Sequence, residues 1–368
     1  GFGGAQRVNR KVLLGKSGGV DSSVAALLLQ KEGWEVIGCT MRLHIDPPDA
    51  PPREGGCCSF RDVQDARMVC YQLGIDHLVF NFTELFTKSV IENFASEYEN
   101  GRTPNPCIRC NRFLKMGAML QRARELGIDH IATGHYALTG ELENGRYYLK
   151  AAPTDKDQSY VLYCLEQGQL QHLLLPLGNY TKPQIRAIAE EAGLRVAHKP
   201  DSQEICFVED NDYHAFLKRY RGHDSQPGDF IDREGNVLGH HLGLTHYTVG
   251  QRKGLGISFG QPMYVDALIP SKNQVVLGPE GTQYRSFTYA SEVNWVSIEK
   301  PEGPIHVQVK IRYQARPAGA TITPEENDTV RVDFDEPQRA VTPGQAVVFY
   351  DSDCFVLGGG LIFYPDEK

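Results

Sequence analysis

Ser17-Gly18-Gly19-Val20-Asp21-Ser22-Ser23 is the stretch that decides the fold of this chain. An apolar run at 11–15 precedes it and another at 24–29 follows it, which predicts a strand, a glycine turn and a helix. Such a turn points backbone N–H groups and the positive end of a helix at an anion. The glycines let a phosphate approach the backbone closely. We therefore predict a phosphate-binding loop, with a ligand-free serine cap as the alternative.

Side chains of the same turn complete the predicted phosphate site. Ser17, Ser22 and Ser23 add hydroxyl donors, and Asp21 is placed to hold a magnesium ion beside the phosphates. The closing Gly-Lys-Ser/Thr of a Walker loop is missing, so a different class of nucleotide loop is indicated.

The first half of the chain repeats the alternation of strand and helix. Apolar runs at 36–41, 77–82 and 130–135 are typical of strands, and helical spacing covers 62–73, 85–98 and 113–126. This alternation predicts an α/β fold with a doubly wound parallel sheet that binds ligands at the carboxyl ends of its strands. The glycine turn, Met41 and Gly134-His135 all follow strands, so we expect them to share one pocket.

The second half changes character after a helical region at 176–217. Short strands with glycine turns are expected at 228–232, 235–239 and 263–266. Longer alternating strands at 307–313, 330–334 and 346–350 predict a small closed β-barrel. We therefore predict three domains: a catalytic α/β domain at 1–217, a small central domain at 218–284 and a C-terminal β-barrel at 285–368.

Composition narrows the class of protein. The chain has 368 residues, 41% of them hydrophobic, and a formal net charge of −8, which is ordinary for a globular protein. No run is as long as a membrane helix and residues 1–10 lack a signal peptide's apolar segment, so we expect a cytoplasmic protein that does not bind membranes. Nine cysteines without a secretory signal favour metal or redox chemistry over a disulfide scaffold.

Cys107 and Cys110 form a C-x-x-C pair directly after two prolines, at an expected helix start. A helix N-terminus and nearby cations lower a thiol's pKa, which suits a nucleophile or a metal ligand. Cys206 lies in a second polar segment, 200–207, before the domain change. Cys39, Cys70, Cys164 and Cys354 are expected in the core, whereas the pair Cys57-Cys58 has either an auxiliary redox or metal role or none.

Positive charge gathers near the C-x-x-C pair although the whole chain is acidic. Six basic residues and no acidic one lie between Arg102 and Arg124, and two further clusters occupy 218–221 and 251–253. We predict contacts with phosphates here, with solvated helix faces as the alternative. His240-His241 and His246 are candidate metal ligands, but turn histidines are favoured because no carboxylate or cysteine stands at matching spacing.

The glycine turn matches the S-G-G-x-D-S motif of the PP-loop ATP pyrophosphatases, which cleave ATP between its α- and β-phosphates and adenylate an oxygen. Nearly the whole chain resembles one group among them, the tRNA-uridine 2-sulfurtransferases. The shared segments are the PP-loop, T-P-N-P-x-x-x-C-N at 103–111, T-G-H-Y-A at 133–137, 156–160, D-S-x-x-I-C-F at 201–207 and 312–313. The resemblance implies that tRNA is the substrate and that the wobble uridine becomes 2-thiouridine.

The resemblance also implies roles for individual residues. Nucleotide and magnesium binding falls to Gly15, Lys16, Ser17, Gly18, Gly19, Val20, Asp21, Ser22, Met41 and Gly134. Asn105, Pro106 and Cys107 would surround the target base, and further tRNA contacts fall to His135, Lys156, Asp157, Gln158, Arg312, Tyr313 and Gln345. Cys110, Cys206, Cys107 and Asp21 would be catalytic. Many relatives have Met where this chain has Lys16, which either touches a phosphate or faces solvent.

One departure from the family pattern bears on the sulfur chemistry. Many bacterial members have Asp at position 107, and there sulfur arrives as a persulfide on the second cysteine, which the first then attacks to form a disulfide. Cys107, Cys110 and Cys206 together resemble the cluster-dependent thiolases instead, in which three thiolates hold a [4Fe-4S] cluster with one open iron. We favour the cluster over the persulfide route, with zinc third because structural zinc sites generally have four protein ligands.

A sulfur-donor protein is expected as a partner on either route. Two other classes of function stay open from the sequence. One is a PP-loop ligase for a small molecule, which would not need the three cysteines or the barrel. The other is a non-catalytic iron–sulfur or zinc protein in which the glycine turn is only a helix cap.

Overall fold

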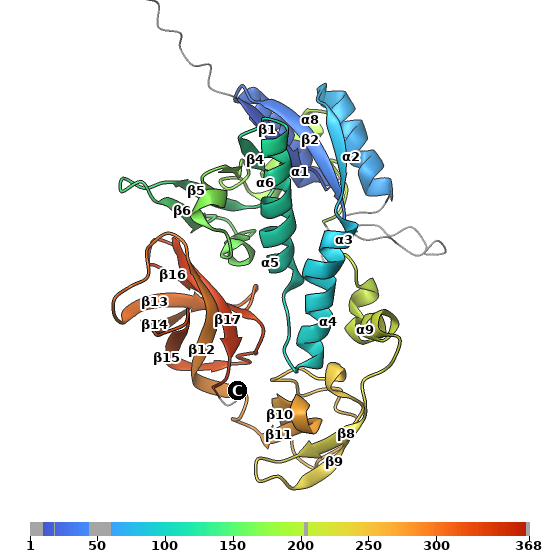
Figure 1. The fold of residues 1–368 in the computed structure, drawn as a ribbon, viewed down its shortest axis with the longest axis vertical. Coiled ribbons are helices and arrows are strands. Elements are labelled where there is room, and N and C mark those ends of the chain that lie inside the picture. Colours follow the sequence, from blue (N-terminus) through green and yellow to red (C-terminus); the bar gives the residue numbers. More distant parts are fainter. Residues whose placement is uncertain (1–9, 18, 44–59, 202–204, 366–368) are drawn as a thin grey trace, which may run out of the picture. The chain divides into compact units, whose positions relative to one another are not determined.

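The computed structural model describes residues 10–17, 19–43, 60–201 and 205–365. The chain folds into two compact units (Figure 1). The first contains residues 1–87 and 110–207, and the second contains residues 88–109 and 208–368. None of the helices in the described ranges is both long and apolar enough to cross a membrane.

A five-stranded parallel sheet forms the centre of the first unit, with strand order β3-β2-β1-β4-β7; β1, β2 and β4 are labelled in Figure 1. Its strands are β1 (Lys11–Gly15), β2 (Glu35–Arg42), β3 (His77–Asn81), β4 (His130–Ala132) and β7 (Leu173–Leu174). The chain winds outward from β1 to β3 and then returns to place β4 on the other side of β1. The predicted doubly wound sheet is confirmed, and its topological switch point lies beside β1, where such sheets bind ligands.

Helices cover both faces of this sheet. Val12 and Leu14 of β1 belong to the same core cluster as Val24 and Ala25 of α1 (Val20–Lys31). Successive strand residues point to opposite faces, and a Cβ on Gly15 would lie 3.2 Å from the sulfur of Met119 in α6 (Met119–Glu125). α1 and α6 therefore lie on opposite sides of β1.

The remaining helices of the α/β region are α2 (Phe60–Leu73), α3 (Thr83–Phe86), η1 (Thr87–Ile91), α4 (Glu92–Glu99), α5 (Pro106–Cys110), η2 (Asn111–Ala118), η3 (Ser159–Leu162), α7 (Gln167–Leu170) and α8 (Lys182–Glu191). The helices expected at 62–73, 85–98 and 113–126 are present, with bounds that differ by one or two residues, whereas η3 and α7 were not expected. A hairpin of β5 (Ala137–Glu141) and β6 (Tyr147–Ala151) was not expected from the sequence. The expected helix start at Pro106 is confirmed, because α5 begins there.

In the second unit, a four-stranded sheet of order β10-β11-β8-β9 follows α9 (Tyr213–Arg221). Its strands are β8 (Gly228–Ile231), β9 (Val237–His241), β10 (Met263–Ile269) and β11 (Gln274–Pro279). Three short 3-10 turns accompany it: η4 (Glu209–Asn211), η5 (Leu244–His246) and η6 (Pro270–Lys272).

A closed six-stranded barrel ends the chain, as predicted. Its strands, in the order in which they pair, are β12 (Tyr284–Trp295), β15 (Val330–Arg339), β14 (Ala318–Pro324), β13 (Ile305–Lys310), β16 (Ala346–Tyr350) and β17 (Val356–Phe363). The strand expected at 307–313 was too long. β13 ends at Lys310, so Arg312 and Tyr313 lie in the connection that turns the chain back into β14.

Part of the basic cluster at 218–221 pairs with acidic residues within the second unit, and its contact with RNA stays a prediction. Arg221 binds Glu92 of α4 at 2.9 Å and Glu99 at 2.6 Å, and Arg219 lies 3.6 Å from Glu209. Aromatic rings join the same two helices, with Phe94 of α4 5.9 Å from Phe216 of α9 between ring centroids. These contacts dock α9 against α4.

Candidate active site

Asp21, in the first turn of α1, is the centre of a polar network in the first unit. Its Oδ1 accepts hydrogen bonds from the Tyr136 hydroxyl and from Lys182 Nζ, each at 2.6 Å. Lys182 also lies 2.5 Å from Asp201 Oδ1, so one ammonium joins two carboxylates. Burial and the hydrogen bond to Asp21 raise the pKa of Tyr136, which therefore remains a neutral donor.

Tyr136 and Lys182 were not found from the sequence as partners of Asp21, nor was Asp201 as a partner of Lys182. Tyr136 directly follows Gly134-His135, which was a usable signal. Lys182 carried none, because it is 161 residues from Asp21. Its position follows from the helix that bears it: Thr181 caps α8 with a capping box, and the helix starts at Lys182.

The structure brings Gly134 and the start of α1 together, as expected. A Cβ added to Gly134 would lie 3.0 Å from Ser22 N and 3.1 Å from the carbonyl carbon of Asp21. Met41 lies on β2, two residues beyond Cys39, which pairs with Gly15 at the end of β1. The carboxyl ends of β1, β2 and β4 thus carry the residues expected there.

We expect Gly134→Ala to destabilise the protein by about 1–3 kcal/mol, because the new methyl group would press on backbone that cannot rotate away. The substitution should also distort the start of α1 and lower the affinity for ATP. Urea unfolding and ATP titration measure both effects. Gly168→Ala in α7 is the matched control, since a Cβ there meets nothing within 4 Å. Equal behaviour of the two variants would contradict the close approach at Gly134.

The hydroxyl groups of the turn are partly engaged by the backbone. Ser23 Oγ donates to Gly19 O at 2.8 Å, and Ser22 Oγ lies 3.4 Å from the same oxygen. Ser17 is exposed. Gly18 lies outside the described residues, as do Cys57 and Cys58. Val20 is buried at the start of α1.

Lys16 does not face solvent, which corrects one of its two expected positions. Its side chain is 3% exposed and Nζ donates to Ser23 Oγ at 3.0 Å. Burial lowers the pKa of Lys16 to about 8 from the ordinary 10.5. Its ammonium therefore points into the fold, toward α1.

Lys16→Met is expected to stabilise the protein at pH 7. Below pH 8 the folded chain carries the full cost of a buried ammonium, about 3 kcal/mol for a pKa shift of this size. From pH 8 to 10.5 the unfolded chain binds more protons, so wild-type stability rises with pH and the advantage of the variant shrinks. Urea unfolding of both proteins at pH 7 and pH 10 tests this. A stability difference that does not change with pH would contradict it.

Several expected tRNA-contacting residues are engaged in holding loops. Asp157 Oδ1 accepts from the backbone of Ala152 and Ser159, and Gln158 Oε1 accepts from Tyr136 N at 2.9 Å. His135 lies 2.7 Å from Thr133 Oγ1. Burial, with the charge of Lys115, lowers the pKa of His135 to about 3, so this imidazole is neutral. Lys156 is exposed.

The basic stripe from Arg102 to Arg124 is less available than its sequence indicated. Arg102 pairs with Glu97 at 2.7 Å, Arg109 Nε donates to Ser89 O at 2.7 Å and Arg122 lies 3.3 Å from Glu125. The sequence of the stripe did not reveal these partners, because Glu97 and Ser89 belong to other helices and Glu125 lies just after Arg124. Arg112 and Arg124 remain exposed.

The three cysteines differ in exposure. Cys107 is exposed and Cys110 is 8% exposed, three residues apart on α5, whereas Cys206 is half-buried. Asn105 Oδ1 accepts from Cys107 N at 3.2 Å, which caps this helix. Cys110 and Cys206 belong to the same unit as the PP-loop. The sequence therefore places one thiol at the surface and a second deeper along the same helix.

Three other cysteines are core residues, as expected. Cys39, Cys70 and Cys164 are buried, and burial raises the pKa of each, that of Cys164 to about 12. Cys354 was wrongly expected in the core. It is exposed in a turn between β16 and β17, where Asp351 Oδ1 accepts from the backbone N–H groups of Asp353 and Phe355.

In the second unit, Gln345 holds the segment that leads into α5. Its Nε2 donates to Thr103 O at 2.8 Å and to Pro104 O at 3.3 Å, and Thr103 N donates to Pro343 O. The barrel thereby positions the chain just before Asn105 and Pro106. Arg312 and Tyr313 are exposed in the connection after β13.

Known proteins resemble this chain along nearly its whole length. Family models match residues 10–210 (tRNA methyl transferase HUP domain), 214–279 (tRNA methyl transferase PRC-barrel domain) and 285–362 (aminomethyltransferase beta-barrel domain). The tRNA-specific 2-thiouridylase MnmA of Acetivibrio thermocellus is 54% identical, over 96% of this chain and 99% of its own. The enzyme of the same name from Clostridioides difficile is 51% identical, over 96% and 98%.

A solved 4-thiouridine synthetase–RNA complex with bound ATP is 23% identical, covers 54% of this chain and 44% of its own, and has a TM-score of 0.36. The family assignment therefore rests on the relatives and the family models and not on the solved complex. Because a family model spans more than half of the chain and full-length relatives are half identical to it, the chain belongs to the tRNA-specific 2-thiouridylase family.

Proposed function

We propose that this chain replaces the C2 oxygen of the wobble uridine of tRNA with sulfur, at the expense of ATP. The names of its relatives support tRNA thiolation. The observation that carries the proposal is the Asp21–Lys182–Tyr136 network at the start of α1, in the same unit as Cys110 and Cys206. A helix start with an organised carboxylate suits ATP, and nearby thiols suit sulfur transfer.

The PP-loop residues would bind and orient ATP. Backbone N–H groups at the start of α1, from Gly19 to Ser22, are suited to the phosphates. Oδ1 of Asp21 is held by Tyr136 and Lys182, so Oδ2 would serve a magnesium ion, and a carboxylate oxygen is the donor that this ion prefers. Bound magnesium would neutralise charge on the phosphates. Lys182 would add a fixed positive charge next to Asp21. Met41 and Gly134 would flank the nucleoside.

The chemistry would proceed in two displacements. The uridine C2 oxygen attacks the α-phosphorus of ATP, an O–P bond forms and pyrophosphate leaves with the electrons of the broken bond. A sulfur nucleophile then adds to C2, the C2–O bond breaks and AMP leaves with the former base oxygen. Asp21 acts in the first displacement, and Cys110 and Cys206 act in the second.

For the sulfur, we propose that Cys107, Cys110 and Cys206 hold a [4Fe-4S] cluster. Three thiolates are the donors such a cluster requires, and Cys107 and Cys110 stand at i and i+3 of α5. A bound cluster would offer one open iron for hydrosulfide. The alternative uses a Cys206 persulfide that Cys110 attacks as the sulfur leaves, forming a disulfide. A donor protein supplies sulfur in both cases.

Anaerobic purification with iron and labile-sulfide analysis separates these two routes. The cluster route expects about four iron atoms and four sulfides per chain, lost in Cys107→Asp and Cys206→Ser. An iron-free protein that still thiolates tRNA would overturn the cluster and leave the persulfide route.

The remaining predicted site residues would position the tRNA. We propose that the protein acts in the cytoplasm, where its tRNA substrate is found. Asn105 and Pro106 would contact the target base, and the exposed Lys156, Arg312 and Tyr313 would meet the RNA backbone. His135, being neutral, would contribute hydrogen bonds rather than charge. Asp157, Gln158 and Gln345 would act by holding the loops that they bind.

We expect conversion of ATP to AMP and pyrophosphate to depend on tRNA. Two acceptor RNAs, one with uridine and one with cytidine at the wobble position, give the sharpest comparison, because cytidine keeps the C2 oxygen but has an amino group at C4 and no hydrogen at N3, so the pair tests selection of uridine. Radiolabelled pyrophosphate release measures the result. Turnover that ignores tRNA would indicate a small-molecule ligase, and absence of nucleotide binding would indicate that the turn only caps a helix.

A further inference from the structure

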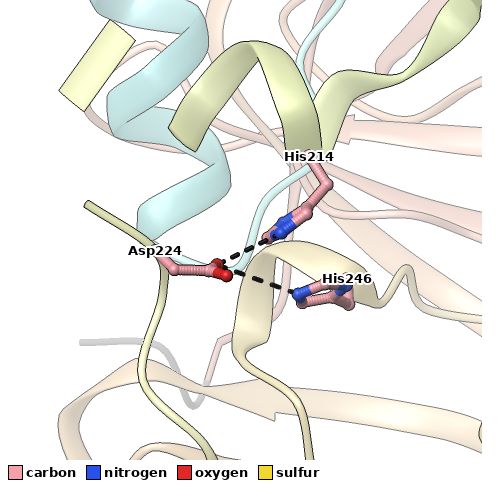
Figure 2. Close-up of side chains that lie close together, drawn as sticks. All are labelled: His214, Asp224 and His246. Atoms are coloured by element: carbon pink, nitrogen blue, oxygen red, sulfur yellow. Dashed lines mark ion pairs between the residues drawn. The ribbon is translucent and has the colours of Figure 1, made fainter. Parts of the chain in front are cut away.

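Two histidines and one aspartate meet in the second unit, and none of them is among the residues assigned to ATP or sulfur. His214 stands on α9, Asp224 in the loop that follows it and His246 at the end of η5 (Figure 2). One ligand atom from each lies within 4.8 Å of the other two. Sequence spacing did not reveal this group, because folding brings together elements 32 residues apart.

The geometry within the group is that of atoms converging on a shared point. Oδ1 of Asp224 lies 3.1 Å from His214 Nε2 and 3.9 Å from His246 Nε2. This oxygen is buried and accepts no hydrogen bond from any described residue, although the nearer nitrogen is within range. A buried oxygen without a donor is costly. Two ligands on a tetrahedral zinc ion are about 3.3 Å apart, given bonds of about 2.0–2.1 Å.

Neighbouring groups prepare the histidines as metal ligands. His214 Nδ1 lies 3.1 Å from Thr245 Oγ1, which is 2.9 Å from Ser225 Oγ. A hydrogen bond from Nδ1 to this hydroxyl leaves the Nε2 lone pair facing Asp224, the usual arrangement around a metal-bound imidazole. His246 presents its Nε2 to the same carboxylate oxygen, at 3.9 Å. Without a bound cation, the Nε2 lone pairs of His214 and His246 would face the Asp224 carboxylate.

We propose that His214, Asp224 and His246 bind a divalent transition-metal ion, with zinc as the species to test. Two imidazole nitrogens and one carboxylate oxygen suit zinc and leave a fourth position for water. A cavity of about 320 Å³ lined by His214 and Asp224 gives room for that water and for entry of the ion. The ion would fasten α9 and its loop to η5, and so stabilise the folded unit.

Zinc titration of the full-length chain tests the site. Positions 57, 58, 107, 110 and 206 are first changed to serine, so that thiolates do not compete for the ion. After removal of metal with a chelator, calorimetry is expected to show one site per chain. His214→Ala and His246→Ala should weaken zinc binding at least 100-fold. His240→Ala is the matched control, because this histidine also pairs with an aspartate, Asp229, at 2.9 Å but lacks a third ligand among the described residues.

A spectroscopic measurement covers the case in which a histidine variant fails to fold. X-ray absorption of the zinc-loaded serine variant should show nitrogen and oxygen neighbours at about 2.0 Å with imidazole scattering. Zinc should also raise the unfolding temperature of this protein and of His240→Ala, but not of His246→Ala. Failure to bind zinc, or equal affinities in His214→Ala and His240→Ala, would overturn the proposal. The iron and sulfide content expected for the cysteine cluster is unaffected by either result.

Discussion

Cys110→Ser is expected to lower the rate of 2-thiouridine formation by about 10³-fold or more, because a hydroxyl can neither serve as a thiolate ligand of the cluster nor attack the Cys206 persulfide as a thiolate. Of the three proposed cysteines Cys110 is the buried one, and it is the last residue of α5. Mobility of purified tRNA on a mercury-containing gel measures the thiolated product directly.

The control for this variant is Cys354→Ser, which removes an exposed thiol from a turn of the barrel. It should thiolate tRNA at the wild-type rate. Cys110→Ser should still release pyrophosphate in a first turnover with tRNA, because adenylation precedes sulfur transfer. If Cys110→Ser made 2-thiouridine at the rate of Cys354→Ser, the assignment of Cys110 to sulfur transfer would be wrong.

Asp21→Asn should lower tRNA-dependent AMP formation by about 10²–10³-fold. The amide has the size of the carboxylate but no charge, so it cannot neutralise Lys182 or hold magnesium. Lys182 is only about one-tenth exposed, and in the variant Asp201 would be its one remaining anionic partner among the described residues. Loss of the ion pair should therefore affect both nucleotide turnover and stability, and steady-state kinetics with unfolding experiments separate the two.

Tyr136→Phe is the matched variant for Asp21, because it removes one of the two hydrogen bonds to the same Oδ1 and retains the charge. Its loss of activity should be about 10- to 100-fold, in line with one hydrogen bond from a neutral donor to a charged acceptor. A second comparison is Asp201→Asn, which keeps the bond between Lys182 and Asp21. Wild-type turnover in Asp21→Asn would show that this carboxylate serves only the fold.

Much of the fold could be predicted because its signals are local. The strand at 11–15, the glycine turn and α1 are adjacent in the chain, and the repeated alternation of strand and helix leads to a parallel sheet. The helix start at Pro106 was equally local, since a proline follows a capping asparagine. β7 was missed because two residues carry no periodicity, and its existence depends on pairing with β4.

Charged groups were predicted least well from the sequence. The ion pairs of Arg221 were not predicted, because its partners Glu92 and Glu99 stand more than 120 residues earlier. Lys16 was expected at a phosphate or in solvent, and the packing that encloses its ammonium beside Ser23 excludes only the second position. The partners and the pKa of a charged side chain depend on its surroundings, and distant parts of the chain supply those surroundings only after folding.

The sequence alone predicted the PP-loop, the parallel sheet, the barrel and the cysteines on which sulfur chemistry would depend. Each of these features has a signal in neighbouring residues or in a short repeated pattern. Tertiary structure alone decided which cations meet Asp21, that Gln345 clamps the segment before α5, and that His214, Asp224 and His246 converge. These contacts join distant parts of the chain, and no local pattern encodes a distance that is set by the packing of whole helices and sheets.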